Sequence, residues 1–519
     1  MCGFIGLVSE EPQRYQKQFD DGFKTLQARG TTADVLREAS ASYGFCRLPT
    51  DDVYNMELAA IQRHQGAVIL FNGLLTNTDR LAQHYGLGNA CAQSDTVCMR
   101  SGFAAHGADF LRRCQGMFAC AKVNSARIML ARDGAGVKPL YYVCEPDMFA
   151  FASELKTLAP LLRPIQEVLP GQIVTYDRSS RTLTVQNFAF EPLEPSTGLL
   201  NVLTTAVVEP TLRYLTQSDK KVALLLSGGL DSSIIAGILA NHLPDQLRAR
   251  LVAFCIGSPS APDVHAARKL AQTLNITFEH VSLPSAEQLL SRLPGIVYDV
   301  ESPHARVVRV ALLHDELARA IKRRDIDIVI GGEGADELFF GYRRFIEGLL
   351  PAESERAFTS FYKGVFFNTL LQRFERIFAR NLIEGRVPYL DQAVVRIATA
   401  LPPNAKVKHH SDGGHTSKLP LRQLARQIHL PSYIYNRPKE KMTSGATCQE
   451  NSTVADGFLE RETRALTGCS FQELVTTLYK LFYYQNGADC LRRGPGFTTE
   501  DEVMKMVRAL QTKKMGNVR

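Results

Sequence analysis

A short glycine- and serine-rich loop between a buried strand and a helix constrains the fold of this chain most strongly. Val222–Leu226 is a continuous apolar run, and Ile234–Leu243 has the spacing of an apolar helix. Between them, Ser227–Ser233 reads SGGLDSS. Two glycines permit a tight turn, and the serine hydroxyls with the helix N-terminus form a cradle for an anion such as pyrophosphate. Because no lysine follows at P-loop spacing, this is a different phosphate loop, in which Asp231 can hold a Mg²⁺ that bridges phosphates.

The segments after this loop alternate between strand and helix patterns. Leu251–Ile256, Ile276–Leu283 and Ile326–Ile330 are further apolar strands, and helices are predicted at Asp263–Leu274 and Val307–Arg324. Such alternation predicts βαβ units and a parallel sheet whose ligand site lies at the carboxyl ends of the strands. From about residue 345 the pattern becomes mostly helical.

The first part of the chain has a different pattern. Short apolar runs alternate with turns at Gly66–Asn72, Ile128–Ala131 and Met148–Ala152, and a helix is predicted at Pro12–Ala28. Short strands of this kind predict an antiparallel, β-rich domain with helices packed against it.

A linker is predicted between the two patterns, because prolines and charges gather at Phe190–Gly198. With 519 residues, the chain is long enough for two to three domains of ordinary size. We expect an N-terminal domain at residues 1–190 and a C-terminal domain at residues 191–519.

Composition and charge argue against several kinds of protein. The 11 cysteines show no CxxC spacing, which disfavours a disulfide framework or a zinc site and predicts a reducing, cytoplasmic environment. Glu10 and Glu11 are acidic where a signal peptide is basic, and no apolar run approaches the roughly 18 residues of a membrane span. The net charge of +7 comes without a nucleic-acid recognition motif, so we expect neither nucleic acid nor a membrane as a partner.

The SGGLDSS loop resembles the pyrophosphate loop of the N-type ATP pyrophosphatases, and in particular the synthetase half of the glutamine-hydrolysing asparagine synthetases. The resemblance implies ATP and Mg²⁺ as cofactors and an α/β fold with a parallel sheet, followed by a helical C-terminal part. It also implies the residues that bind ATP, which are Leu226, Ser227, Gly228, Gly229, Asp231, Ser232, Ser233, Ile256 and Gly332.

A second acidic segment follows the strand at Ile326–Ile330. Gly331–Glu337 reads GGEGADE and is similar to the family's SGEGxDE, with glycine in place of its serine. The resemblance implies that Asp336 is the second Mg²⁺ ligand, opposite Asp231. It also implies that Glu333 is the base that takes a proton from the attacking ammonia.

Three later segments follow the order of the same family. Arg437–Lys441 reads RPKEK and looks like its late lysine loop, so Lys439 is expected to neutralise charge on the α-phosphate as pyrophosphate leaves. Glu384–Asp391 reads EGRVPYLD and is similar to the family's E-x-R-V-P-F-L-D. Lys418 and Arg422 fall where the family has basic residues facing the nucleotide.

Cys2 is the candidate nucleophile of the first domain. A small side chain at this position permits removal of Met1, and the freed α-amino group, with a pKa of roughly 7.7–8, can act as the base for the thiol. The start MCGFIG resembles the class II N-terminal-nucleophile (Ntn) amidotransferases, which implies an αββα sandwich and glutamine as nitrogen donor. By the same resemblance, the glutamine carboxylate is held by Arg47, the oxyanion by Asn72 and Gly73, and the α-amino group by Asp95.

Two motifs of those amidotransferases are altered in this chain. Where the family reads NGE-x-x-N, Asn72–Asn77 reads NGLLTN, so Leu74 replaces a carboxylate that contacts the amino group of glutamine. The family's RGPD appears only as RGTT at Arg29–Thr32. Loss of a carboxylate from an ammonium site weakens binding. This departure therefore predicts weak glutamine binding or a different amide donor.

The resemblance extends to about residue 490 and implies an ATP-dependent, glutamine-hydrolysing amidotransferase that adenylates a carboxylic acid. Aspartate or an aspartate-like acid is the expected acceptor. Arg309 stands where the family has an arginine before its long helix, but the neighbouring threonines are absent. The expected partners are therefore small molecules, namely glutamine, ATP and the acceptor acid. Homodimers are common in that family, so a homodimer is a further expectation.

The main alternative is an ATP-dependent cyclase of the β-lactam synthetase kind, which closes an acyl-adenylate onto the substrate's own amine. Glu301, Ser302 and the segment Asn436–Lys439 look like that group. Those enzymes resemble a form with tyrosine where Glu333 stands, and some lack the nucleophilic cysteine, whereas this chain keeps Cys2. The pattern therefore favours the amidotransferase. A regulatory protein without activity is disfavoured because the metal-binding carboxylates are retained.

Overall fold

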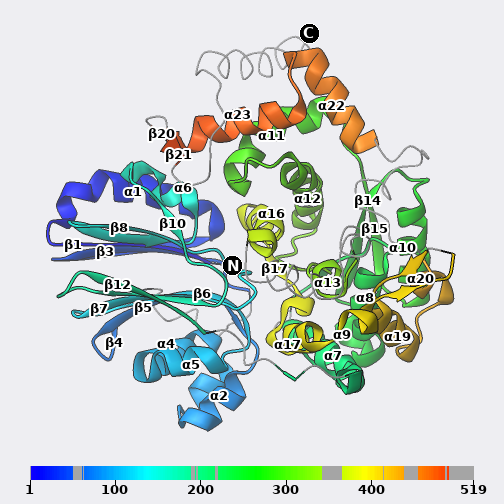
Figure 1. Cartoon of the computed structure of the whole chain (residues 1–519), viewed down its shortest axis with the longest axis horizontal. Helices are drawn as coiled ribbons and strands as arrows, with labels where there is room; N and C mark the ends of the chain where they lie inside the picture. Colours follow the sequence, from blue (N-terminus) through cyan, green and yellow to red (C-terminus); the bar gives the residue numbers. More distant parts are fainter. Residues whose placement is uncertain are drawn as a thin grey trace.

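The computed structural model describes residues 2–50, 61, 63–188, 193–194, 197–216, 220–341, 365–412, 414–437, 454–485 and 488–489. Two parts lie side by side, and the N-terminus lies in the middle of the molecule, between them (Figure 1). Within the described residues, no helix combines the length and the apolar character needed to span a membrane.

Two antiparallel six-stranded sheets form the N-terminal part, with strand orders β10-β8-β9-β1-β3-β2 and β12-β11-β7-β6-β5-β4. Every residue of β5 except Gly73 is buried, because one face of the strand meets the other sheet and the opposite face is covered by helices. The three predicted strands are confirmed as parts of β5, β7 and β9. The strands are β1 (Gly3–Ser9), β2 (Thr32–Glu38), β3 (Ala41–Arg47), β4 (Arg63–His64), β5 (Ala67–Leu75), β6 (Gly116–Val123), β7 (Arg127–Arg132), β8 (Tyr141–Glu145), β9 (Met148–Ala152), β10 (Gln166–Glu167), β11 (Gln172–Asp177) and β12 (Thr182–Asn187).

Helices cover both outer faces of these sheets and complete the predicted αββα sandwich (Figure 1). The predicted helix at Pro12–Ala28 is present, but as α1 with a 3₁₀ turn at each end, η1 (Pro12–Tyr15) and η2 (Gln27–Arg29). The first sheet is covered by α1 (Gln16–Leu26) and α6 (Leu155–Leu158), and the second by α2 (Thr78–Tyr85), α3 (Asn89–Gln93), α4 (Asp95–His106) and α5 (Ala108–Arg113).

A five-stranded parallel sheet, in the order β15-β14-β13-β16-β17, forms the centre of the C-terminal part. The four predicted strands are confirmed as β13 (Val222–Leu225), β14 (Leu251–Gly257), β15 (Thr277–Ser282) and β16 (Ile328–Ile330). The sequence did not indicate the fifth strand, β17 (Glu384–Arg386), because it has three residues, two of them charged. Those two charges neutralise each other, since Arg386 Nε donates to Glu384 Oε1 at 2.8 Å.

The helices of this part flank the sheet, and one begins earlier than predicted. The helix α8 starts at Leu230 rather than at Ile234, so Asp231 and Ser232 belong to its first turn and not to the loop. The other helices are α7 (Leu200–Thr216), α9 (Asp245–Arg248), α10 (Pro262–Thr273), α11 (Ala286–Val300), α12 (Ala305–Arg323), α13 (Ala335–Leu338), α16 (Val365–Arg380), α17 (Gln392–Ala400), α18 (Pro403–Lys406), α19 (Leu419–Gln427), α20 (Ser432–Tyr435), α22 (Val454–Thr467) and α23 (Phe471–Tyr483).

A buried set of charged residues joins the two parts. Glu301, at the end of α11, accepts hydrogen bonds from the backbone N–H groups of Leu155 and Lys156 at 3.1 and 2.8 Å. The same carboxylate forms an ion pair with Arg376 of α16 at 2.7 Å. Because removing one partner would leave a charge buried and unpaired, these contacts hold the two parts in one relative position. Glu301, which the cyclase interpretation drew on, therefore has a structural role.

Candidate active sites

Cys2 immediately precedes β1, and the N-terminal end of the chain lies in the middle of the molecule, between its two parts (Figure 1). Its backbone nitrogen donates a hydrogen bond to Asn72 Oδ1 at 3.2 Å. Its carbonyl oxygen accepts a hydrogen bond from Arg29 Nε at 3.0 Å. The main chain of the candidate nucleophile is therefore held on both sides of its Cα atom.

Asn72 offers the hydrogen-bond donor that an oxyanion would need. The side chain is fully buried in β5, yet its Nδ2 atom has no partner among the described residues. An unsatisfied buried donor costs free energy and is rare, so it indicates a group that a ligand satisfies. The next residue, Gly73, lies where an added Cβ would come 2.3 Å from the carbonyl oxygen of Met117, so only glycine fits there.

Arg29 uses all three of its guanidinium nitrogens in buried contacts. Besides Cys2, it binds Glu154 Oε1 at 2.6 Å and both carboxylate oxygens of Glu375. Burial acts against its charge, but Glu375 and Glu154 outweigh burial and raise the pKa of Arg29. The sequence marked this residue only as a remnant of an altered motif. Its contact with Glu375 joins residues that are 346 positions apart.

The residues predicted to hold glutamine lie at the end of a strand and the start of a helix. Arg47 ends β3, and Asp95 begins α4, whose N-cap residue Ser94 accepts a hydrogen bond from the Val97 N–H at 3.2 Å. Burial, and then the charge of Arg47, lower the pKa of Arg100 in α4. No feature of the sequence pointed to this second arginine.

Leu74 has an apolar environment in place of the acidic one that the family motif would supply. Its side chain is 3% exposed and belongs to a core cluster that contains Met117 and Val137 of the sandwich. The same cluster continues into the C-terminal part through residues such as Leu226 and Leu390. The altered position therefore contributes to packing between the two parts of the molecule.

The SGGLDSS and GGEGADE segments follow neighbouring strands, β13 and β16. The connections from β13 and β16 lead toward opposite edges of the sheet, and in open parallel sheets a ligand site is expected between the carboxyl ends of two such strands. Gly332 packs closely against the first turn of α8, because an added Cβ would lie 3.2 Å from the backbone nitrogen of Ser232. The predicted residues Leu226 and Ile256 lie at the carboxyl ends of β13 and β14.

Hydrogen bonds within the SGGLDSS segment prepare it to bind an anion. The hydroxyls of Ser227 and Ser232 are 3.1 Å apart, and the Gly229 N–H donates to Ser227 Oγ at 3.3 Å. Gly228 has a φ of 68°, a conformation that favours glycine, and an added Cβ would lie 2.7 Å from Ala266. The loop and the N-terminal turn of α8 together can hold phosphate oxygens.

Asp231 and Asp336 converge on one point beside this loop. Asp231 Oδ2 and Asp336 Oδ1 each lie 2.5 Å from Lys418 Nζ. Asp231 Oδ1 is buried and has no hydrogen-bond partner among the described residues. Among the described residues, no third His, Cys, Asp or Glu side chain forms a metal-binding group with these two carboxylates. This donor set fits Mg²⁺, which takes one or two protein carboxylates and completes its octahedron with phosphate oxygens and water.

Glu333 lies at the same edge of the sheet, next to two residues that the sequence did not indicate. Arg373 Nη2 is 3.2 Å from Glu333 Oε2, and His314 Nε2 is 3.8 Å from Glu333 Oε1. Burial, and then the charge of Arg373, lower the pKa of His314 to about 3, so this imidazole is neutral near pH 7. Since His314 is uncharged, Arg373 is the cation that faces Glu333.

Glycine replaces the family's serine at residue 331, and the packing of Phe374 explains the replacement. A Cβ added to Gly331 would lie 2.7 Å from the ring of Phe374, and one added to Gly385 would lie 2.5 Å from it. The ring therefore packs directly against the backbone of Gly331 and Gly385. A larger residue at either position would push the ring away from β16 and β17.

Lys439 lies outside the described residues, but the segment that leads to it is firmly attached to the nucleotide loop. Arg437 donates to the carbonyl oxygen of Gly228 at 3.1 Å and to Asp263 Oδ1 at 2.5 Å. Arg422 donates in turn to the carbonyl oxygen of Arg437 at 3.2 Å. Arg422, predicted to face the nucleotide, also donates to the carbonyl oxygens of Ser417 and Tyr435 and so helps to hold this segment in place.

Arg309, considered from the sequence for the acceptor, contacts the C-terminal helices. Its guanidinium lies 5.0 Å from the ring centroid of Phe471 and 3.5 Å from Glu460 Oε2. These contacts give it a role in packing α12 against α22 and α23.

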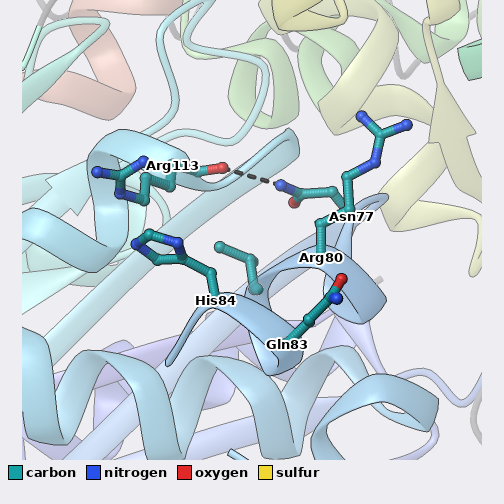
Figure 2. Close-up of a pocket in the computed structure, with 6 residues that line it drawn as sticks. Asn77, Arg80, Gln83, His84 and Arg113 are labelled. Atoms are coloured by element: carbon teal, nitrogen blue, oxygen red, sulfur yellow. Dashed lines mark hydrogen bonds between the residues drawn. The ribbon is translucent and has the colours of Figure 1, made fainter. Parts of the chain in front are cut away.

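A separate pocket of about 410 Å³ opens on the surface of the sandwich, and none of the predicted site residues lines it. Figure 2 shows Arg80, Gln83 and His84 of α2 together with Arg113, and Asn77 Nδ2 donates to the carbonyl oxygen of Arg113 at 2.9 Å. Its exposed lining residues Arg80, His84 and Arg113 carry nitrogen-containing side chains, while Leu81 is buried, and the pocket belongs to neither of the two sites described above.

Comparison with known proteins identifies the family. Residues 1–190 match the glutamine amidotransferase domain family, and residues 204–363 and 351–481 match the asparagine synthase family. A probable glutamine-hydrolysing asparagine synthetase of Acanthamoeba polyphaga mimivirus is 27% identical, covering 87% of this chain and 86% of its own length. Asparagine synthetase B of Escherichia coli is 29% identical, covering 86% and 82%. The chain belongs to the asparagine synthase family and carries a glutamine amidotransferase domain at its N-terminal end.

Proposed function

We propose that this protein adenylates aspartate or an aspartate-like acid with ATP and Mg²⁺, and amidates it with ammonia released from glutamine. The convergence of Asp231 and Asp336 beside the SGGLDSS loop, with Glu333 at the same edge of the sheet, carries the proposal. Relatives of similar length are glutamine-hydrolysing asparagine synthetases, which supports the acceptor and the nitrogen donor.

Glutamine hydrolysis takes place in the domain that we assign to residues 1–190. Removal of Met1 leaves the amino group of Cys2 as the base for its own thiol, and the thiolate attacks the amide carbon of glutamine. The unpaired Nδ2 of Asn72 and the N–H of Gly73 stabilise the oxyanion that forms. Arg47 and Asp95 orient the substrate. Collapse of the tetrahedral intermediate releases ammonia, and water then releases glutamate from the thioester.

Acid activation takes place in the domain that we assign to residues 191–519. The backbone and hydroxyl groups of Ser227–Ser233 hold the phosphates of ATP. When bound, Mg²⁺ neutralises phosphate charge from its place on Asp231 and Asp336. The acceptor carboxylate attacks the α-phosphorus and pyrophosphate leaves, with Lys439 offsetting the developing negative charge. Glu333 then removes a proton as ammonia attacks the acyl-adenylate, giving the amide and AMP.

The direct test is pyrophosphate release from ATP and Mg²⁺ with aspartate, with glutamine, ammonium or neither as nitrogen source. Mass spectrometry should find asparagine, AMP and glutamate in equal amounts with glutamine, and asparagine and AMP with ammonium. A cyclised product from an acid that carries its own amine, formed without any nitrogen donor, would instead establish the cyclase alternative. A homodimer stays a prediction from the family, to be checked by light scattering.

A further inference from the structure

The helix α16 lies near the centre of the molecule (Figure 1) and contacts residues of both sites. Three consecutive side chains make these contacts. Arg373 binds Glu333, Phe374 packs on Gly331, and Glu375 binds Arg29.

On the amidotransferase side, Glu375 is two contacts away from the main chain of the nucleophile. The carboxylate is 1% exposed and accepts from both terminal nitrogens of Arg29, while Arg29 Nε donates to the Cys2 carbonyl oxygen at 3.0 Å. A bidentate pair fixes the plane of the guanidinium, so it also fixes the direction in which Nε points. Burial disfavours the charge of Glu375, but Arg29 outweighs burial and lowers the pKa of this carboxyl group.

On the synthetase side, Arg373 fixes one oxygen of the candidate base. Its Nη2 is 3.2 Å from Glu333 Oε2. The ring of Phe374 sits within van der Waals reach of Gly331 and Gly385, so rotation or sliding of α16 would collide with the ends of β16 and β17. Arg373 and Glu375 are therefore held at fixed positions relative to the sheet.

We propose that α16 positions both reaction centres, with Glu375 acting on Cys2 through Arg29 and Arg373 acting on Glu333. Glu375 and Arg373 are positioning residues, because neither is required to touch the reacting atoms. The inference rests on the proposed function, since it assigns the nucleophile to Cys2 and the base to Glu333.

The first test is Glu375→Gln, which keeps the shape of the side chain and removes its charge. The turnover number for glutamine hydrolysis should fall roughly 10- to 100-fold, because a small misplacement of a catalytic group has effects of this size. The KM for glutamine and the ammonium-dependent amide formation should stay within about twofold of wild type. Glu375→Asp, which keeps the charge, should recover part of the lost turnover.

The matched control is Glu301→Gln, which removes another buried carboxylate of the same interface. Glu301 binds Arg376 and the amides at the start of α6 instead of Arg29. Equal losses of glutamine hydrolysis in the two variants, at equal melting temperature, would reduce Glu375 to a structural residue and overturn the proposal.

The second test is Arg373→Gln, which should impair the synthetase reaction and spare glutamine hydrolysis, the reverse of Glu375→Gln. Ammonium-dependent amide formation should fall roughly 10- to 100-fold, with its pH profile displaced, while glutamine hydrolysis stays near wild type. A fall in both activities by the same factor would overturn the assignment.

Failure of the proposed function would be recognised separately from failure of this inference. If the wild-type protein forms no amide with any acceptor, the proposed function fails. The effect of Glu375 can still be measured without an acceptor, as the rate at which iodoacetamide alkylates Cys2, followed by mass spectrometry. An unchanged alkylation rate in Glu375→Gln would then overturn the inference by itself.

Discussion

Asp231 and Asp336 share one counter-ion, because Asp231 Oδ2 and Asp336 Oδ1 both lie 2.5 Å from Lys418 Nζ. The ammonium group offsets the repulsion between two carboxylates held side by side. The proposed function places Mg²⁺ on the same two carboxylates, so the metal and the ammonium group would compete for these ligands. If Mg²⁺ displaced Lys418, the lysine charge would become available to the phosphates of ATP.

Lys418→Met should make the stability of the protein depend more strongly on Mg²⁺. Without metal, the variant should lose about 1–3 kcal/mol of unfolding free energy, because a buried charged contact is removed. Saturating Mg²⁺ should raise the melting temperature of the variant more than that of wild type. Thermal denaturation with and without Mg²⁺ measures both effects, and Lys408→Met, at an exposed lysine, is the control. An equal rise in melting temperature with Mg²⁺ in wild type and Lys418→Met would show that Mg²⁺ and Lys418 do not use the same carboxylates.

Asp231→Asn should stop acid activation whichever nitrogen source is supplied. Pyrophosphate release should fall at least roughly 100-fold, because a neutral amide is a poor ligand for the cation that offsets phosphate charge. Glutamine hydrolysis should continue, since Cys2 lies in the other part of the molecule. Asp412→Asn, at an exposed aspartate, is the control. Full activity of Asp231→Asn would reject the metal role of this residue.

Cys2→Ala should separate the two nitrogen sources. Amide formation from glutamine should be abolished, while ammonium should support the same rate as in wild type, because the synthetase site is untouched. Product analysis with each nitrogen source measures the difference. Cys144→Ala, which changes another half-buried cysteine, should leave both activities in place. Loss of the ammonium reaction in folded Cys2→Ala would show that the two sites do not divide the work as proposed.

His314 should contribute a definite pH dependence to stability. Its pKa is about 3 in the folded protein because of burial, against about 6.5 for an unfolded histidine. The unfolded chain therefore binds more protons between these values, and stability falls as the pH falls through this window. From pH 6.5 to 5 the loss due to His314 should be about 2 kcal/mol.

Urea denaturation of His314→Gln at both pH values measures this contribution. The variant should lose less stability than wild type over the interval, by the amount assigned to His314. His84→Gln, which changes an exposed histidine, should show the same loss as wild type. A loss in His314→Gln equal to that of wild type would show that His314 is charged in the folded protein.

Much of the fold could be predicted because its signals are local. Strand Val222–Leu225 and its helix were recognisable from apolar spacing, although the helix begins four residues earlier than its apolar pattern indicated. Asp231 and Ser232 are polar residues in the first helical turn, so apolar periodicity does not mark the true start of the helix. The strand Glu384–Arg386 was missed for a related reason, since its charged side chains pair with each other inside the protein.

The sequence by itself indicated the candidate residues of both sites, namely Cys2 with Asn72 and Gly73, and the SGGLDSS loop with its second acidic segment. Each of these is a short motif whose function depends on neighbouring residues and on the strand before it. Only the tertiary structure decided what Lys418, Arg373 and Glu375 do, because their partners are separated from them by 187, 40 and 346 positions. A buried charge is tolerated where an opposite charge lies next to it in the folded protein. Because the two residues are far apart in sequence, no periodic pattern along the chain indicates such a pair.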